Sequence, residues 1–182
     1  MNLHPQRAFT LVELRITLAL LAILVGVAVP AFAELIARKR QLALQDVMLA
    51  ALNYTRAQAV LSNSVVELCA SGNGTSCQTD WSQGWIIRQA SDGKVLRFSQ
   101  QASGSSLRWR GFRQHVGFAG NGIGFASNGS FFECDQQKLA WLIVLNRQGR
   151  ARIGNAADKH ERLHLCGAPD EVTDDDIETA ES

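Results

Sequence analysis

Phe9-Thr10-Leu11-Val12-Glu13-Leu14-Arg15 begins the segment that decides the fold of this chain, because a long apolar stretch follows it at once. Residues 16–32 carry no charged side chain. A helix over residues 9–32 would be about 36 Å long, enough to cross a lipid bilayer. An ionised carboxylate such as Glu13 is costly in hydrocarbon unless a partner compensates it. The segment therefore predicts a helix that meets both a membrane and another molecule.

Basic side chains in front of the apolar stretch predict its orientation. His4 and Arg7 should stay in the cytoplasm, which places the chain beyond the helix outside it. A secretory leader removed after the small residues of 31–33 is the alternative. Glu13 and the continuation of the helical pattern into the basic residues 38–40 favour a retained anchor. We expect Arg15 to act as a topology anchor that reaches the headgroups.

The helical pattern continues far beyond the apolar stretch, over residues 9–62. Pro30 should kink or locally open this helix. Its second half is amphipathic, and we expect its apolar stripe to pack on a β-sheet. The stripe consists of Leu35, Leu42, Val47, Leu49, Leu52 and Ala59.

From Val65 onward, short β-rich runs separated by glycine-rich turns replace the helical pattern. The glycines of residues 117–124 indicate a hairpin connection. We expect an α+β fold, with a long N-terminal helix packed on an antiparallel β-sheet. The expected strands are Val65–Cys69, Trp85–Gln89, Val95–Phe98, Ser106–Arg110, Ile123–Ala126, Ser130–Cys134, Trp141–Leu145 and Arg150–Ile153, with Leu163–Cys166 as a further candidate. The four tryptophans should belong to the core rather than stack on bases.

Four cysteines lie in the part of the chain predicted to be outside the cytoplasm, where disulfides persist. Three pairings are open to four cysteines. We favour Cys69–Cys77, across a short polar turn, and Cys134–Cys166, which ties a late strand to the C-terminal region. Zinc is the alternative use of four cysteines, but the chain holds no Cys-x-x-Cys pair, so we expect no metal.

The net charge of +1 hides an asymmetry between body and tail. Residues 170–182 contain seven acidic residues and no basic one, which leaves 18 basic against 10 acidic residues in the rest of the chain. We expect this acidic tail to be disordered. Its role is either solubility or competition with an anionic ligand for the basic body.

Phe9-Thr10-Leu11-Val12-Glu13-Leu14 resembles the class III signal of type IV pilins and of type II secretion pseudopilins. The resemblance implies cleavage by a prepilin peptidase between Ala8 and Phe9, followed by N-methylation of Phe9. It departs from the usual pattern at Ala8, where these proteins normally have glycine. It also implies that Glu13 pairs with the N-terminus of a neighbouring pilin during filament assembly. An inner-membrane protein with a single pass and a periplasmic domain follows from this resemblance.

These features divide the chain into four expected parts. Residues 1–8 form the leader peptide, and residues 9–32 form the transmembrane and assembly helix. Residues 33–169 form a periplasmic pilin-like domain, which includes the second half of the helix. Residues 170–182 form the acidic tail.

Further residues narrow the resemblance to the GspH/FimT family, which contains minor pilins of type IV pili and minor pseudopilins. They are Val66-Glu67-Leu68-Cys69, Cys77, Trp81, Gly84-Trp85, the run from Gly129 to Asp135, and Gly149-Arg150-Ala151-Arg152. The resemblance covers nearly the whole chain apart from the tail. It favours a minor subunit over a major pilin.

Gly149-Arg150-Ala151-Arg152 resembles the Gly-Arg-x-Arg motif with which FimT-type minor pilins bind DNA. On a strand, Arg150 and Arg152 would point to one face about 6.6 Å apart and could contact successive phosphates. Gly149 would permit a tight turn before that strand, and Arg147 would extend the row. A second basic group with interleaved aromatic residues contains Arg108, Arg110 and Arg113. The alternative for all these arginines is a solvated strand face or a lateral contact in a filament.

Two hypotheses about function therefore remain open. In the first, this is a minor pilin that binds extracellular double-stranded DNA without sequence preference for uptake in natural transformation. In the second, it is a structural minor pilin or a type II secretion pseudopilin that primes filament assembly. No catalytic motif or cofactor-binding motif is evident in the sequence, so we expect neither an enzyme nor a cofactor.

Overall fold

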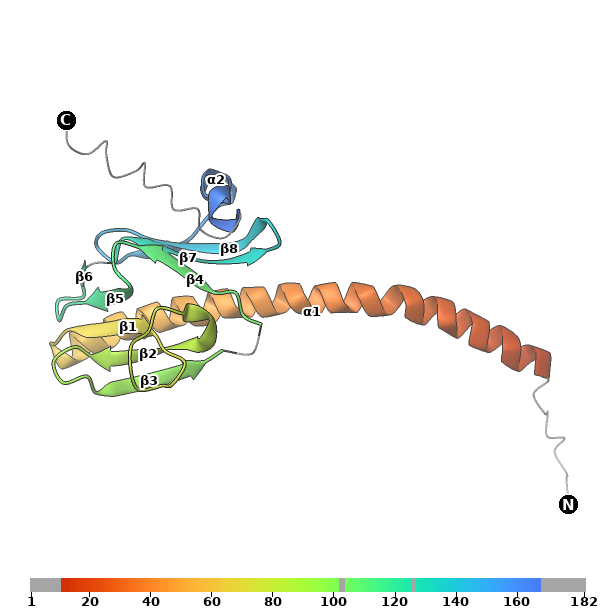
Figure 1. The fold of residues 1–182 in the computed structure, drawn as a ribbon, viewed down its shortest axis with the longest axis horizontal. Coiled ribbons are helices and arrows are strands. Elements are labelled where there is room, and N and C mark those ends of the chain that lie inside the picture. Colours follow the sequence, from red (N-terminus) through yellow and green to blue (C-terminus); the bar gives the residue numbers. More distant parts are fainter. Residues whose placement is uncertain (1–10, 102–103, 126, 168–182) are drawn as a thin grey trace, which may run out of the picture. The chain divides into compact units, whose positions relative to one another are not determined.

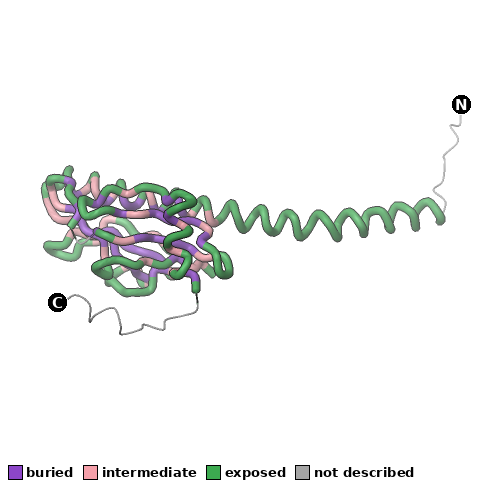
Figure 2. The backbone as a smooth tube through the Cα atoms, turned by 90° about the horizontal axis from the view of Figure 1, so that it is seen from above, coloured by how far each residue is buried: buried purple, intermediate pink, exposed green. Residues whose placement is uncertain are grey.

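The structure is a computed structural model that describes residues 11–101, 104–125 and 127–167. Helix α1, Leu11–Ser62, is 52 residues long and contains Pro30. It runs through Pro30 without interruption, so the local opening expected there is absent. Residues 11–40 of α1 are exposed along their whole length (Figure 2), and this helix is long and apolar enough to cross a membrane.

The chain divides into two compact units, residues 1–40 and residues 41–182. All buried residues of the described chain lie between Gln45 and Cys166, so the second unit contains the whole core. After α1, its elements are β1 Val66–Ala70, the 3-10 helix η1 Trp81–Gln83, β2 Gly84–Gln89, β3 Val95–Gln100, β4 Arg108–Gly111, β5 His115–Phe118, β6 Gly124–Phe125, β7 Gly129–Asp135, β8 Lys138–Leu145, β9 Ala151–Ile153, α2 Ala156–Glu161 and the 3-10 helix η2 Leu163–Cys166 (Figure 1).

The strands form two antiparallel sheets. The first has the order β3-β2-β1-β5-β6, and the second has the order β4-β7-β8-β9. A long helix followed by antiparallel sheets confirms the predicted α+β fold. The two edge strands of the second sheet, β4 and β9, carry three of the arginines singled out in the sequence, Arg108, Arg110 and Arg152.

One face of the last turns of α1 is buried against the sheets. Met48, Leu52, Thr55 and Ala59 are fully buried or nearly so, and their spacing of three and four residues places them on one side of the helix. They join a core that includes Leu68 of β1, together with residues of β2, β5, β7 and β8. Burial of a side chain such as Leu52 contributes about 2 kcal/mol. The apolar stripe expected from the sequence was only partly correct: Leu52 and Ala59 are buried and Leu49 is half-buried, whereas Leu35, Leu42 and Val47 are exposed.

A second, smaller core covers the other face of the second sheet. Phe132, Leu139 and Leu142 pack there with Cys166 of η2. Cys134 of β7 forms a disulfide with Cys166, which attaches η2 to the sheet. The other disulfide joins Cys69 to Cys77. The structure thus has the two pairs favoured from the sequence.

Several local predictions were wrong. Leu163–Cys166 is a 3-10 helix, in which Leu165 and Cys166 pack on the second sheet and do not extend it. Residues 119–123 form the predicted hairpin connection between the antiparallel strands β5 and β6, but Gly117 and Phe118 belong to β5 and not to the connection. Gly117 weakens the strand pattern in the sequence, and in the structure Phe125 packs over this glycine and leaves no room for a side chain. Helix α2 was not anticipated, because its six residues are too few to show a helical period.

We expect removal of either disulfide to destabilise the second unit, and removal of Cys134–Cys166 to cost more. The two bridges close segments with sequence separations of 8 and 32. In the chain-entropy account these lengths correspond to about 2.5 and about 3.7 kcal/mol of unfolding free energy. Urea unfolding of residues 41–182 with each cysteine pair changed to serine measures both values. An equal or smaller loss for the longer loop would contradict the expectation.

Candidate functional site

A tight turn between β8 and β9 presents two of the predicted arginines. Asn146 Oδ1 accepts hydrogen bonds from the backbone N–H of Gln148 at 3.1 Å and of Arg150 at 2.9 Å. The N–H of Gly149 donates to the carbonyl of Asn146 at 2.9 Å. Arg147 and Arg150 are both exposed. The turn therefore holds its backbone rigidly and leaves these two side chains in solvent.

Gly149 sets the geometry of this turn. Its φ of +74° is in the left-handed region, and a Cβ would lie 2.6 Å from Cε1 of Phe118 and 2.9 Å from Cα of Gly124. Any other residue would combine backbone strain with steric overlap. Gly149 is itself buried, so its place in the Gly-Arg-x-Arg pattern is to position the turn.

Arg56 of α1 supports the same turn from the side of the helix. Its Nε donates to the carbonyl of Gly122 at 2.6 Å, and its Nη2 donates to the carbonyl of Gln148 at 3.3 Å. Its guanidinium carbon is 5.5 Å from the centre of the Phe118 ring. No sequence pattern indicates this role, because Arg56 is one polar residue among others on the helix.

Arg152 of β9 is engaged within the protein. Its Nη1 and Nη2 donate to the two carboxylate oxygens of Asp158 at 2.6 and 2.7 Å, a bidentate pair. The prediction that Arg150 and Arg152 lie on one strand was wrong, because strand β9 begins at Ala151 and leaves Arg150 in the turn. Arg152, unlike Arg150, has a carboxylate partner within the chain.

Asp158 also caps helix α2. Its carboxylate accepts from the N–H of Asn155 at 2.9 Å, while its own N–H donates to Asn155 Oδ1 at 2.9 Å. The hydrogen bonds from Arg152, and then the one from Asn155, hold the pKa of Asp158 well below its usual range. Arg162 Nη1 lies 3.5 Å from Asp158 Oδ1. One carboxylate thus serves two guanidinium groups, and the cluster keeps a net positive charge.

The arginines of β4 lie on the same face of the second sheet as Arg152. Arg108 and Arg110 alternate along the strand, and both are exposed, which agrees with the predicted shared face. In the register of the second sheet, Arg110 of β4 is opposite Ser130 of β7. Ser130 is opposite Val144 of β8, and Val144 is opposite Arg152 of β9. Residues directly opposite one another across a sheet share a face. Arg110 and Arg152 therefore stand at the two ends of one row, about 14 Å apart across three strand spacings.

Two hollows bring the β4 side of the site together with the β8–β9 turn. The first, of about 500 Å³, contains Arg110, Arg162 and His164 in its lining. The second, of about 360 Å³, contains Arg147. Both hollows are also lined by Phe112 and Asn128. Arg110 and Arg147, which are far apart in the sequence, thus flank one common ridge.

The assembly residues lie at the start of the chain. Glu13 is in the first turn of α1 and is exposed. Ala8 and Phe9, predicted to flank the cleavage site, lie outside the described residues, as does the acidic tail. The described residues contain no group of three or more His, Cys, Asp or Glu side chains that could hold a metal ion.

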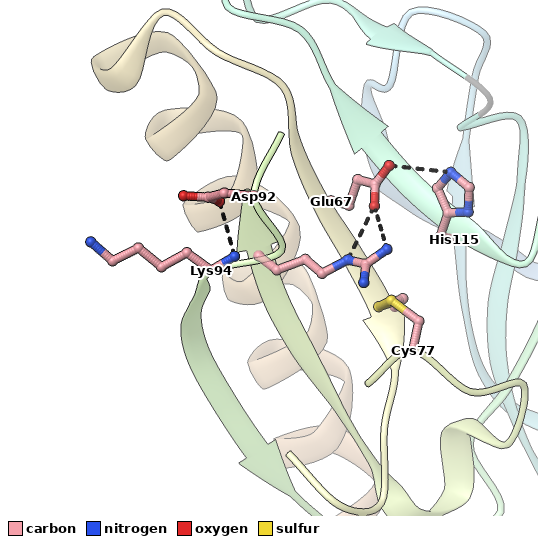
Figure 3. A network of polar contacts seen from close by, with 7 residues as sticks. Glu67, Cys77, Asp92, Lys94 and His115 are labelled. Carbon is pink, nitrogen blue, oxygen red and sulfur yellow. Dashed lines mark hydrogen bonds and ion pairs between the residues drawn. A yellow bond between two sulfur atoms is a disulfide. The ribbon is translucent and has the colours of Figure 1, made fainter. Parts of the chain in front are cut away.

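A separate polar network crosses the first sheet and is structural in character (Figure 3). Glu67 of β1 accepts from Nε and Nη2 of Arg88 of β2 at 3.3 and 3.1 Å. His115 Nε2 of β5 is 3.7 Å from the other oxygen of Glu67. The carboxylate therefore links three adjacent strands.

A long N-terminal helix packed on antiparallel sheets, with an apolar first half, defines the class of type IV pilin-like proteins. A family model described as type II transport protein GspH matches residues 45–149, more than half of the chain. A prokaryotic N-terminal methylation motif matches residues 3–29. The chain therefore belongs to the GspH family and is a GspH/FimT-like type IV pilin. The family match ends at Gly149, so Arg150 and Arg152 lie beyond it.

The fold is shared by a solved structure. A crystal structure of the type IV minor pilin FimU from Pseudomonas aeruginosa (strain PAO1) has a TM-score of 0.53 and 18% sequence identity, and the similarity covers 66% of this chain and 92% of that one. A second crystal form of FimU has a TM-score of 0.44 and 19% identity, with 59% and 87% covered. No curated protein sequence matches this chain. Pilin-like families are structural proteins rather than enzymes.

We expect Asp158→Asn to lower the unfolding free energy at pH 7, because it removes the bidentate partner of Arg152 and half of the α2 cap. The pKa of Asp158 is lowered by folding, so the unfolded chain binds a proton at higher pH than the folded one. The contribution of the carboxylate is therefore complete above about pH 5 and is lost as the pH falls below about 4.

Urea unfolding at several pH values, with Asp46→Asn as the control, measures this effect. Asp46 is an exposed acid of α1. The difference between wild type and Asp158→Asn should shrink on acidification. A difference that stays constant from pH 7 to pH 3, or one no larger than for the control, would contradict the role given to Asp158.

Proposed function

We propose that this protein is a minor pilin of a type IV pilus that binds extracellular double-stranded DNA without sequence preference, for uptake in natural transformation. The observation that carries the proposal is the arrangement of exposed arginines around the second sheet. Arg108 and Arg110 lie on its β4 edge, and Arg147 and Arg150 lie in the turn before its β9 edge. These four side chains come from two separate parts of the sequence.

Such an arrangement suits a phosphate backbone. Arginine donates in pairs to phosphate oxygens, and contacts of this kind position a duplex without reading its bases. The charge of the chain agrees, because residues 1–169 carry a net +8. Arg113 is exposed next to β4 and extends the basic surface.

Arg152 has a different place in this proposal. Arg152 can contact DNA only if it shares or releases the carboxylate of Asp158. About half of the Arg152 side chain, 53%, is exposed. We assign Arg152 mainly to holding α2 against β9. Arg150, with an exposed side chain and a fixed backbone, is the motif residue that contacts phosphate.

Assembly into the filament belongs to the N-terminal segment. We propose that prepilin peptidase cleaves between Ala8 and Phe9, that α1 crosses the inner membrane with the second unit in the periplasm, and that Glu13 compensates the N-terminal ammonium of a neighbouring pilin. The matching methylation motif supports this reading.

A purely structural minor pilin or pseudopilin is the second candidate. The bidentate pair between Arg152 and Asp158 favours it, since one of the two motif arginines has a structural partner within the chain. Both candidates use Glu13 in the same way. They differ in whether the folded protein binds DNA.

We expect the full chain in detergent micelles to bind a fluorescent 30-bp duplex with a strong salt dependence. The double variants Arg108→Gln/Arg110→Gln and Arg147→Gln/Arg150→Gln should each weaken binding by about tenfold or more near 100 mM salt. Each should lower the log–log salt slope by about 2, because two phosphate contacts disappear. Fluorescence anisotropy between 50 and 200 mM NaCl measures both quantities.

Arg97→Gln on β3 of the other sheet is the charge-matched control, because Arg97 is also exposed. Its effect should be small. If the folded wild type fails to bind at 50 mM NaCl, or if the control weakens binding as much as the double variants, the DNA proposal fails and the structural candidate is retained.

We expect Glu13→Ala to abolish incorporation into filaments while the protein still inserts in the membrane. Loss of the carboxylate leaves a neighbouring ammonium uncompensated in an apolar environment, so incorporation should fall by about tenfold or more. Immunoblots of sheared filaments and of membranes from pilus-producing cells measure the two amounts. Glu34→Ala, an exposed acid further along the same helix, is the control. Normal incorporation of Glu13→Ala would contradict the assembly role.

A further inference from the structure

Phe112, in the loop between β4 and β5, is the most exposed aromatic side chain of the described chain. It is 79% exposed, whereas Trp81, Trp85 and Trp141 are buried as expected and Trp109 is half-buried. A single exposed apolar residue requires no explanation by itself. Phe112 differs because of what surrounds it.

Phe112 forms the ridge between the two hollows described above. One side of the ridge has Arg110, Arg162 and His164, and the other side has Arg147. Asn128, which lines both hollows, adds an amide. Among the described residues that line the two hollows, none is acidic. An aromatic ring is thus exposed between two basic depressions.

The backbone of the loop that carries the ring is fixed by hydrogen bonds. The N–H of Phe112 donates to the carbonyl of Asn128 at 3.1 Å, and the indole N–H of Trp109 donates to the carbonyl of Arg113 at 2.6 Å. A Cβ on Gly111 would overlap the Trp109 ring, so this residue must stay small for the loop to keep its path. The loop backbone therefore needs little ordering before the ring binds a ligand.

The cations around the ridge retain binding capacity. Both oxygens of Asp158 accept short hydrogen bonds from Arg152, whereas Arg162 has only a longer ion pair with Asp158, at 3.5 Å, and lines the larger hollow with 27% of its side chain exposed. Arg113 lies over the Phe112 ring, with its guanidinium carbon 6.0 Å from the ring centre. A ring has two faces, so a second planar group can stack on the other one.

We propose that Phe112 is a base-stacking platform and that the larger hollow binds a nucleotide of an unpaired DNA strand. The base stacks on Phe112, and the adjacent phosphates contact Arg110 and Arg162. This inference rests on the proposed DNA binding and goes beyond it, because it adds a site for unpaired nucleotides to a surface that holds duplex. Bases in an intact duplex are already stacked on one another, so only ends, overhangs and single strands can use the ring.

An acidic or apolar protein segment is the competing occupant. The combination of an aromatic ring with arginines on both sides favours nucleic acid, since stacking and phosphate contact are needed together by a nucleotide. An acidic peptide would use the arginines and leave the ring exposed. An apolar partner would use the ring and bury the arginines at a cost.

The test compares two 12-nucleotide probes of equal charge, oligo(dT) and an abasic strand of the same length, together with a blunt 12-bp duplex. The full chain in detergent micelles should bind oligo(dT) at least about fivefold more tightly than the abasic strand. Phe112→Ala should remove this preference while binding of the abasic strand changes by less than about twofold, and Phe112→Trp should restore it. Arg110→Gln/Arg162→Gln should weaken both strands.

Phe98→Ala on β3 is the matched control, because Phe98 is an exposed aromatic residue of the other sheet, at 40%. Circular dichroism and urea unfolding confirm that each variant is folded. Equal binding of oligo(dT) and the abasic strand by the wild type, or an unchanged preference in Phe112→Ala, would overturn the stacking site while duplex binding still supports the proposed function. Absence of binding to all three probes would overturn both. Reduced filament incorporation of Phe112→Ala with unchanged oligo(dT) preference would identify a pilin contact instead and overturn the proposal.

Discussion

The packing of the last turns of α1 against the sheets is the constraint on which the second unit depends. Met48, Leu52 and Ala59 are buried on one side of the helix and contribute to a core that includes strands of both sheets. The same helix supplies Arg56, whose guanidinium group donates to two loop carbonyls. One of those carbonyls belongs to the turn that presents Arg147 and Arg150. The helix therefore supports the core and also fixes the position of the candidate site.

The two faces of the second sheet have different chemistry. Trp109 and Phe131 form a contact on the inner face, with ring centres 4.4 Å apart. The outer face carries Arg110 and Arg152 in one row, and the smaller core with η2 covers part of it. Strict alternation along a strand makes this possible, because neighbouring residues point to opposite faces. A short sheet can thus be anchored by aromatic packing on one side and present cations on the other.

Residue patterns within a few positions of one another predicted the fold well. The helix, the positions of most strands and the α+β arrangement all follow from local periodicity, and the spacing of the cysteines favoured the observed pairs. The candidate site was harder, because its decisive contacts are not visible as periodicity. The Arg152–Asp158 pair depends on α2, a helix of six residues that shows no clear period. The roles assigned to Arg56 and Phe112 depend on neighbouring residues that are distant in the sequence and come together only in the folded chain.

A simpler explanation accounts for some of these arginines but not for all. Edge strands of open sheets carry charged residues that discourage pairing with another chain, and Arg108, Arg110 and Arg152 all lie on the edges β4 and β9. Protection of an edge does not require Arg147 or Arg150, which lie in a turn with a fixed backbone. Phe112 also argues against edge protection as the full explanation, since an exposed aromatic ring beside an edge strand promotes association rather than preventing it. The turn arginines and Phe112 are therefore the residues for which ligand binding gives the better physical account, and the edge arginines are compatible with both explanations.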